Sequence, residues 1–513
     1  MWKKIPSFIF KAIILLAFIS IALCMSFLGK DISRTNSNFK KLAVLPLHCV
    51  RMDSESEFLG FAITDQIIEK LFYIKGVVVR PSDAVRKYGS SKFDLQEVAR
   101  ELDVEYIITG NHQKKDGRFQ IDVQLHNIPD KEVIWEHSLE VRNTDIYTVP
   151  NSICKKIIRG LKLQFSPAEN RRLKKDIPRD PLAYEYYLRA VAIEPSKEAD
   201  WTCRIQLLKK SIELDPTFAL AFADLGYAYL QYAGKIGGRG GYYGLAERTL
   251  RRAFRMNGEL PQAFSYLSSL YAKTGKSEES VELLQNALNI YPNIPSFYSG
   301  LGYIFRYAGL MDESIQFYKL SQRLDSSFLN LVRAQSQITK SLIYQKKYKT
   351  ALASHERMMH YLRQKQQSAD DKKLFYRGMI YLYSKKIDKA IALFDSAFDV
   401  DKSSVWSTFG QAYKEAALGN DESVLEIAKR LEARNIVDGE RRYRLVHFYA
   451  LIGKKEDALR NLKKSIESGF FNFPYISNDP FLDNIRGTKE FKNLLAQAKR
   501  RHQAFKLRFE GKL

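Results

Sequence analysis

Residues 261–326 decide the fold of this chain. They read PQAFSYLSSLYAKTGKSEESVELLQNALNIYPNI and then PSFYSGLGYIFRYAGLMDESIQFYKLSQRLDS. The second segment aligns with the first without a gap at an offset of 34 residues, and large apolar, small and aromatic residues recur in the same order. A fixed period of this length indicates a chain built from repeated helical pairs. The matched positions of the first segment are Phe264, Leu267, Ser268, Tyr271, Gly275, Ser280, Leu284, Ala287 and Pro292.

This pattern is typical of the tetratricopeptide repeat, in which each unit consists of two antiparallel helices. Leu267 and Tyr271 are four residues apart, so both lie on one face of the first helix. Ser268 and Gly302 are small, which lets the second helix approach the first closely. Pro292 ends the second helix because proline cannot donate to the hydrogen-bond ladder. The stretch therefore predicts a binding scaffold and argues against an enzyme.

The repeat pattern continues on both sides of this stretch. We expect an array over residues 181–498 with seven or eight units, beginning after a linker that Pro178 and Pro181 mark. Units at the ends of such an array are expected to be atypical because they cap the stack. The remaining residues, 499–513, form a basic tail.

The concave face of the array is the candidate binding surface. The first helix of each unit is expected to line this groove, and tyrosines there suit peptide recognition because they give a large contact area at low entropic cost. The alternative is that several of these tyrosines only pack between neighbouring helices. Following the repeat offsets, the groove candidates are Tyr227, Tyr266, Lys273, Tyr303, Arg306, Tyr307, Tyr376 and Tyr383.

Residues 40–175 have a different pattern, in which strands alternate with helices and a meander follows. Helical spacing of apolar residues occurs at 57–74 and 93–102. Residues 119–125 alternate strictly between apolar and polar, which predicts a strand with one face in water. Together these features predict a small mixed sheet with helices packed on it. The expected strands are 41–47, 76–80, 105–110, 119–125 and 132–141.

This region resembles the TolB-like amino-terminal domain that accompanies tetratricopeptide repeats in bacterial membrane-tethered proteins, including some class III adenylate cyclases and CadC-type regulators. The resemblance implies a non-catalytic, often extracytoplasmic module. We expect neither a cyclase domain nor a winged-helix DNA-binding domain in this sequence. The stretches that carry the resemblance include Leu42-Ala-Val-Leu-Pro46, Phe58-Leu-Gly60, Val104-Glu-Tyr-Ile-Ile-Thr-Gly110, Trp135-Glu136 and Leu163-Gln-Phe-Ser-Pro167.

Residues 1–30 carry a targeting pattern. Three lysines precede an uncharged run from Ala12 to Gly29, which is about the length needed to cross a bilayer. We expect an uncleaved signal anchor that contacts the membrane through residues 5–28, and a cleaved signal peptide is the alternative. Lysines and arginines flank the run on both sides, so charge alone leaves the orientation open. The short basic head favours export of the body to the periplasmic side of the inner membrane.

The chain has a net charge of +23, and about +16 of it falls in residues 181–513. Dispersed lysines and arginines favour a solvated helical surface over a nucleic-acid site. Two motifs resemble catalytic sites but lack their geometry. Thr274-Gly-Lys-Ser277 has no glycine at the start of a phosphate loop. His355 and His360 are five residues apart, so they point in different directions from one helix.

We therefore predict an α+β multidomain chain with an amino-terminal membrane helix (1–30), a small mixed α/β domain (40–175), and an all-α tetratricopeptide superhelix (181–498). The predicted function is a membrane-anchored, non-enzymatic scaffold that binds protein or peptide partners through its concave face. The alternative is a sensory or regulatory component that acts on a separately encoded adenylate cyclase or transcription regulator. We infer no cofactor, metal or small-molecule substrate, and we do not expect nucleic acid as a partner.

Overall fold

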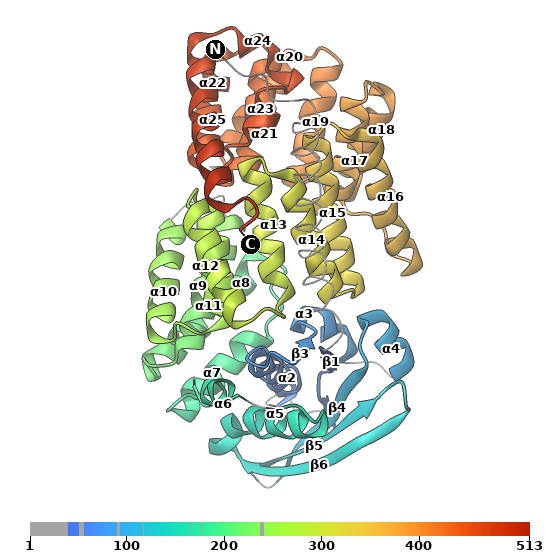
Figure 1. The fold of residues 1–513 in the computed structure, drawn as a ribbon, viewed down its shortest axis with the longest axis vertical. Helices are drawn as coiled ribbons and strands as arrows, with labels where there is room; N and C mark the ends of the chain where they lie inside the picture. The colour runs from blue at the N-terminus through green and yellow to red at the C-terminus, as the bar shows by residue number, and fades with distance from the viewer. Residues whose placement is uncertain are drawn as a thin grey trace, which may run out of the picture.

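The computed structural model describes residues 39–50, 56–89, 93–115, 117–164, 166–175, 177–235, 241–434 and 436–512. The expected membrane segment, residues 1–30, lies outside these ranges. Within them, no helix combines the length and the apolar character needed to cross a membrane. A small mixed α/β domain comes first and a long all-helical array follows it, as the sequence predicted (Figure 1).

The α/β domain holds one mixed sheet with the order β3-β1-β4-β5-β6, and β2 also pairs with β4. β1 runs parallel to both β3 and β4, whereas β4, β5 and β6 form an antiparallel meander. The strands are β1 (Lys40–Val44), β2 (His48–Cys49), β3 (Val77–Val79), β4 (Tyr106–Lys115), β5 (Arg118–Asn127) and β6 (Glu132–Arg142). The α-helices are α2 (Glu57–Leu71), α3 (Ser82–Val85), α4 (Leu95–Leu102), α5 (Val149–Gly160) and α6 (Pro167–Leu173).

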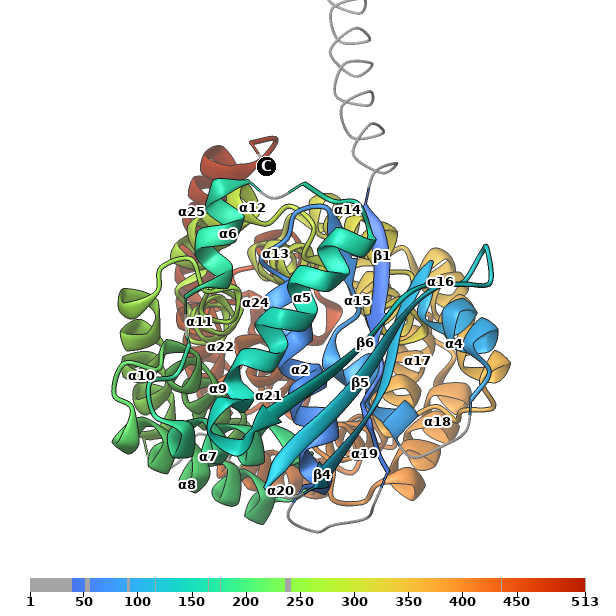
Figure 2. The same ribbon diagram turned by 90° about the horizontal axis from the view of Figure 1, so that it is seen from below.

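The apolar pattern explains how the sheet is covered. Every second residue of β5 from Phe119 to Leu125 is buried, which confirms the predicted alternation. α2 and α5 cover one face of the sheet and α4 lies on the other (Figure 2). α2 buries Ile63 and Ile67 on its sheet side. Its opposite side, which carries Asp65, faces the helical array.

In the part of the chain that the structure describes, the array has eight successive helix pairs, α7 to α22, followed by shorter helices and a long last helix. The first four pairs are α7 (Pro181–Ala192) and α8 (Glu198–Leu214), α9 (Ala219–Lys235) and α10 (Tyr242–Met256), α11 (Pro261–Lys273) and α12 (Ser277–Ile290), and α13 (Pro295–Ala308) and α14 (Met311–Leu324). The next four are α15 (Phe328–Tyr344) and α16 (Tyr348–Gln364), α17 (Asp371–Tyr383) and α18 (Ile387–Val400), α19 (Val405–Ala417) and α20 (Asp421–Glu432), and α21 (Gly439–Leu451) and α22 (Lys455–Glu467). The chain ends with α23 (Phe473–Ile476), α24 (Asp483–Arg486) and α25 (Lys489–Phe509).

The predicted small positions do allow the two helices of a pair to approach closely. A Cβ atom added to Gly302 would lie 2.9 Å from the Tyr318 ring. The serine hydroxyl of the second helix then donates to the backbone of the first: Ser280 Oγ to Ser268 O and Ser314 Oγ to Gly302 O, both at 2.7 Å. The same hydrogen bond between the two helices of a pair thus recurs 34 residues further along the chain.

The α/β domain docks on the array through buried polar contacts. The fully buried Arg80, after β3, donates to Leu324 O at 3.3 Å and lies 3.1 Å from Asp325 Oδ1. Asn293 Nδ2, between α12 and α13, donates to Ile74 O at 2.9 Å. These contacts join the sheet edge to two successive turns of the array.

The array also closes on itself. His502 Nδ1 on α25 lies 2.6 Å from Ala308 O at the end of α13, and Arg501 forms an ion pair of 3.1 Å with Glu278 on α12. Asn472 Nδ2 donates to Arg306 O at 3.2 Å. The predicted basic tail therefore belongs largely to α25, which lies against the early repeats (Figure 1).

Candidate functional site

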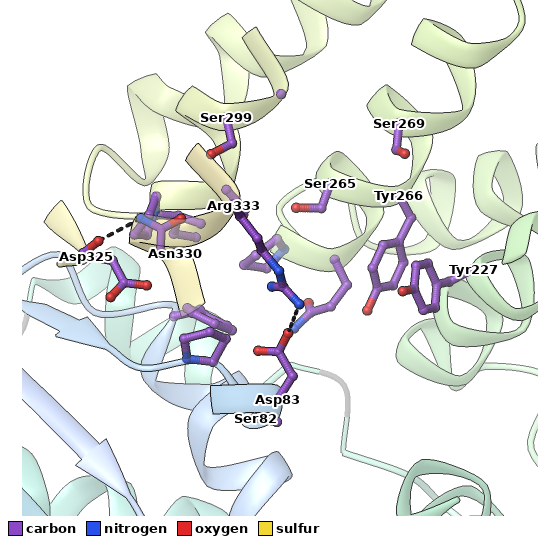
Figure 3. A pocket seen from close by; sticks show the side chains of 18 of the residues that line it. Ser82, Asp83, Tyr227, Ser265, Tyr266, Ser269, Ser299, Asp325, Asn330 and Arg333 are labelled. Atoms are coloured by element: carbon purple, nitrogen blue, oxygen red, sulfur yellow. Dashed lines mark hydrogen bonds and ion pairs between the residues drawn. The ribbon is translucent and has the colours of Figure 1, made fainter. Parts of the chain in front are cut away.

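A cavity of about 780 Å³ lies between the α/β domain and the array. One side is formed by α2 and α3, and the other by α9, α11, α13 and α15, which are the first helices of four successive pairs (Figure 3). Such a volume accommodates a ligand or a short peptide segment. The cavity therefore marks where the inner face of the array remains open.

Two carboxylates of α2, Asp65 and Glu69, are one helical turn apart and line the cavity. Burial, reinforced by the neighbouring Asp224, raises the pKa of Asp65 to about 6, although a hydrogen bond with Ser82 acts against this rise. Burial also raises the pKa of Glu69 well above its usual range, reinforced by Asp65 and Asp224. Buried carboxylates with raised pKa values often mark a functional site.

α9 and α11 contribute an aromatic pair and a third carboxylate. The rings of Tyr227 and Tyr266 stack with their centroids 4.4 Å apart. Asp224, which is 5% exposed, accepts hydrogen bonds from Tyr266 at 3.3 Å and from Tyr187 at 2.8 Å. Burial raises the pKa of Asp224, and these two hydroxyls and Arg204 counteract the effect.

Several buried polar atoms on the cavity wall lack a hydrogen-bond partner among the described residues. These atoms include Glu69 Oε2, Gln262 Oε1 and Arg204 Nε. The Gln262 side chain is 5% exposed. A buried polar group without a partner costs about 1–3 kcal/mol. An occupant that supplies the missing partners, hydrogen-bond donors above all, would recover this free energy.

The wall on the α15 side is polar as well. Arg333 Nη2 lies 2.8 Å from Asp83 Oδ2 on α3, so an ion pair bridges the two domains beside the cavity (Figure 3). Asn330 Nδ2 donates to Asp325 O at 2.7 Å. Ser265 and Ser299 add hydroxyl groups to the lining.

Four of the predicted groove residues lie together at this cavity. They are Tyr227 on α9, Tyr266 and Lys273 on α11, and Tyr303 on α13. Burial lowers the pKa of Lys273, and Asp438 partly offsets the effect. The stacked tyrosines line the cavity from α9 and α11, whereas the charged neighbours of Lys273 are Asp438 and Arg441 at the start of α21.

The other four predicted residues contact other segments of the same chain instead of the cavity. Arg306 forms a buried ion pair with Glu440, and Tyr307 donates to Asp438 Oδ1 at 2.8 Å. Tyr376 lies beneath Lys340, whose Nζ is 4.5 Å from the ring centroid. Tyr383 stacks on Tyr348 with centroids 5.6 Å apart and hydrogen-bonds with Tyr475.

These contacts form a second polar cluster, centred on Glu440 of α21. Burial alone would raise the pKa of Glu440, but Arg306 and Lys340 outweigh it and hold the pKa at about 2. Tyr344 also donates to Glu440 Oε1 at 2.6 Å. In this half of the array, α21 occupies the inner face that the sequence analysis assigned to a partner.

Sequence analysis did not find the charged and amide residues of the cavity, which include Asp65, Glu69, Asp83, Asp224, Gln262 and Arg333. One signal was present, because Asp65 and Glu69 interrupt an apolar helix at a spacing of four residues. Whether that side of α2 faces water or the array depends on docking contacts that periodicity does not reveal.

Two family matches agree with this architecture. Residues 37–156 match the family described as HilA/YgeH-like transcriptional regulator, second domain. Residues 263–294 match the tetratricopeptide repeat. The chain therefore combines a domain of the first kind with a tetratricopeptide array, and such arrays bind protein or peptide partners.

Two curated proteins are similar to parts of the chain. "Putative adenylate cyclase 3" of Rhizobium meliloti is 25% identical over 186 residues, which are 36% of this chain and 32% of that protein. "Anaphase-promoting complex subunit 3" of Schizosaccharomyces pombe is 24% identical over 204 residues, which are 38% of this chain and 27% of that protein. The matches thus span about a third or less of each relative.

The solved structures that match parts of this chain include yeast Tom70 and PilF of Pseudomonas aeruginosa. Yeast Tom70 has a TM-score of 0.37 and 13% identity, with 64% of this chain and 66% of that chain covered. PilF of Pseudomonas aeruginosa has a TM-score of 0.34 and 16% identity, with coverage of 45% and 98% respectively.

Proposed function

We propose that this chain is a membrane-anchored, non-enzymatic scaffold that binds a peptide segment of a protein partner in the cavity between its α/β domain and its array. The observation that carries the proposal is the cavity itself, which is lined by stacked tyrosines and by buried acceptors without partners. The proposed binding site is therefore smaller than the whole concave face that the sequence predicted. It is the part of that face that α21 does not cover.

The chemistry of the wall supports a peptide occupant. An extended peptide presents a row of backbone N–H donors, and Glu69 Oε2 and Gln262 Oε1 are acceptors in need of donors. Tyr227 and Tyr266 offer a flat apolar surface for a side chain of the peptide. The hydroxyl group of Ser265 can both donate and accept, and that of Ser299, which donates to Ser321 Oγ at 2.9 Å, can accept, so these positions tolerate different peptide sequences.

Site-directed photocross-linking tests the proposal. A photoreactive amino acid replaces Ser269, which lines the cavity on α11, in the full chain in its native membranes. The matched control replaces Ser396, an exposed serine on α18. We expect a discrete protein adduct from position 269 that Tyr227→Ala/Tyr266→Ala reduces. Adducts of equal yield from both positions, or no adduct from position 269, would refute the proposal.

The alternative function is a regulatory component that acts on a separately encoded adenylate cyclase or transcription regulator. The similarity of residues 37–156 to a transcriptional-regulator domain and the partial match to a cyclase favour it. It also accords with the resemblance to TolB-like domains of CadC-type proteins. The identity of the cross-linked partner decides between the two functions, because a cyclase or a regulator in the adduct supports the second.

Membrane anchoring and export form a separate part of the proposal. They are supported by the uncharged run from Ala12 to Gly29 in the sequence. Alkaline phosphatase fused after Leu513 tests the compartment of the body. Phosphatase activity is expected for an exported body, and an inactive fusion that is present in normal amounts would contradict export.

A further inference from the structure

The surface around the start of β1 is rich in positive charge. Lys75, Lys162, Arg171 and Lys174 are all exposed. Two hydrogen bonds bring their segments together: Lys40 N donates to Gly76 O at 2.9 Å, and Lys75 N donates to Glu169 Oε1 of α6 at 2.9 Å. A Cβ atom on Gly76 would lie 3.1 Å from Leu163, the neighbour of Lys162.

Two acidic residues within this surface, Glu169 and Glu259, are already engaged. Glu169 is buried and caps α6. Glu259 is shared by Arg171, Arg172 and Lys175 at 3.8, 3.0 and 2.7 Å. Cations therefore outnumber the carboxylates that reach them. The exposed Glu105, whose N–H donates to Lys41 O, lies beside β1 at the start of β4.

The last turn of α25 adds further basic residues on the same side of the molecule, where Lys506 pairs with Glu510 and Arg508 pairs with Glu282. Figure 2 shows α6, the end of α25 and the start of β1 along one side. Leu507 is 80% exposed and stands between Lys506 and Arg508. An exposed apolar side chain flanked by basic residues is typical of a surface that lies on a lipid headgroup layer. We name this side the basic face, defined by Lys40, Lys75, Lys162, Arg171, Lys174, Lys506, Leu507, Arg508 and Lys512.

The length of the connecting chain limits how far this face can lie from a membrane. Nine residues separate Gly29, the end of the uncharged run, from Phe39, where the described chain begins. Even fully extended, such a link spans roughly 30 Å. If residues 5–28 insert into the bilayer as proposed above, the start of β1 and the residues around it must face the bilayer surface.

We propose that the basic face docks on an anionic lipid surface, with Lys75, Lys162 and Lys174 near the headgroups and Leu507 at the interface. This inference rests on the proposed membrane anchoring. Each lysine near an anionic surface contributes about 1 kcal/mol, and the attraction fades beyond a Debye length of roughly 10 Å. Docking would fix the orientation of the cavity relative to the membrane.

Lysine acetylation of the full chain in vesicles tests this proposal. The vesicles contain phosphatidylcholine alone or phosphatidylcholine mixed with phosphatidylglycerol, and mass spectrometry measures the acetylation rate of each lysine. In the anionic vesicles we expect Lys75, Lys162 and Lys174 to react about fivefold more slowly than in neutral ones, the factor that corresponds to about 1 kcal/mol. Lys386, on the remote side at α18, should react equally in both.

Charge-reversal variants complete the test. Lys75→Glu/Lys174→Glu should abolish the protection of Lys162, whereas Lys386→Glu/Lys402→Glu, with the same change of charge, should preserve it. Equal rates in neutral and anionic vesicles would overturn the proposal, as would protection by added DNA but not by lipid. Flotation of the vesicles distinguishes membrane anchoring from docking of the basic face. A chain that does not float with the vesicles refutes the anchoring. A chain that floats but whose lysines are acetylated at the same rate in both kinds of vesicle refutes only the docking.

Discussion

Arg80 Nη1 lies 3.1 Å from Asp325 Oδ1, and the two side chains are 0% and 5% exposed. This buried ion pair joins the sheet of the α/β domain to the turn between α14 and α15. It closes one end of the interface that also contains the cavity. The relative position of the two domains, and with it the shape of the cavity, therefore depends on polar contacts that water does not reach.

Replacing Arg80 by methionine should destabilise the chain by about 3–5 kcal/mol, because Asp325 would remain buried without its partner. Chemical denaturation followed by circular dichroism measures the change. The matched control is Arg333→Met. Arg333 also bridges the two domains, through Asp83, but its side chain is 61% exposed. The free energy of unfolding of that variant should fall by less than about 1 kcal/mol. Equal falls in both variants would contradict a stabilising role that is specific to the buried Arg80–Asp325 pair.

Gly302→Ala tests the packing of the repeat. The added methyl group would lie 2.9 Å from the Tyr318 ring, so α13 and α14 must move apart. We expect this to lower the free energy of unfolding by about 1–3 kcal/mol. The free energy of unfolding is the measurement. Gly487→Ala serves as control, since a Cβ there meets no described atom within 4 Å, and its effect should stay within about 0.5 kcal/mol. A neutral Gly302→Ala would refute the close approach.

Asp65 should make the chain less stable as the pH rises. Its pKa is raised from 3.8 to about 6, so between these values the folded state binds more protons than the unfolded state. The stabilisation that protonated Asp65 gives the folded state is therefore present at low pH and is lost as the pH rises through about 6. Denaturant midpoints measured from about pH 4 to about pH 7 should fall more steeply for the wild type than for Asp65→Asn. Parallel curves would contradict the raised pKa.

The closure of the array predicts a local effect of two hydroxyl groups. Tyr303 and Tyr307 donate to Asp438, just before α21, at 2.9 and 2.8 Å. Tyr303→Phe/Tyr307→Phe removes two hydrogen-bond donors from this carboxylate. Each lost hydrogen bond should cost about 1–3 kcal/mol of stability. Amide hydrogen exchange in α21 should become faster, whereas Tyr186→Phe on α7 should leave it unchanged. Unchanged exchange in the double variant would show that α21 is held by other contacts.

Local features of the fold could be predicted because neighbouring residues determine them. The alternation from Phe119 to Leu125 corresponds to the buried face of β5, and the small residues Ser268 and Gly302 accept the serine hydroxyls of the facing helices. The repeat offset also placed Tyr227 and Tyr266 on adjacent helices, where they stack.

The candidate site could be predicted only in part, because it is assembled from contacts between distant segments. Tyr307 meets Asp438 across 131 residues, and Arg306 meets Glu440 across 134. Repeat offsets identify the inner face of the array but not what covers it. The same holds for Asp65 and Glu69, whose environment depends on how α2 docks on the array.

The most direct test of the central claim is the affinity of the full chain for the peptide segment identified by cross-linking from position 269. Isothermal titration calorimetry compares the wild type with Ser269→Trp, which fills the cavity, and with Ser396→Trp on the remote α18. The account predicts at least a tenfold loss of affinity, about 1.4 kcal/mol, for Ser269→Trp and wild-type affinity for Ser396→Trp. Wild-type affinity in the Ser269→Trp chain would contradict binding in the cavity.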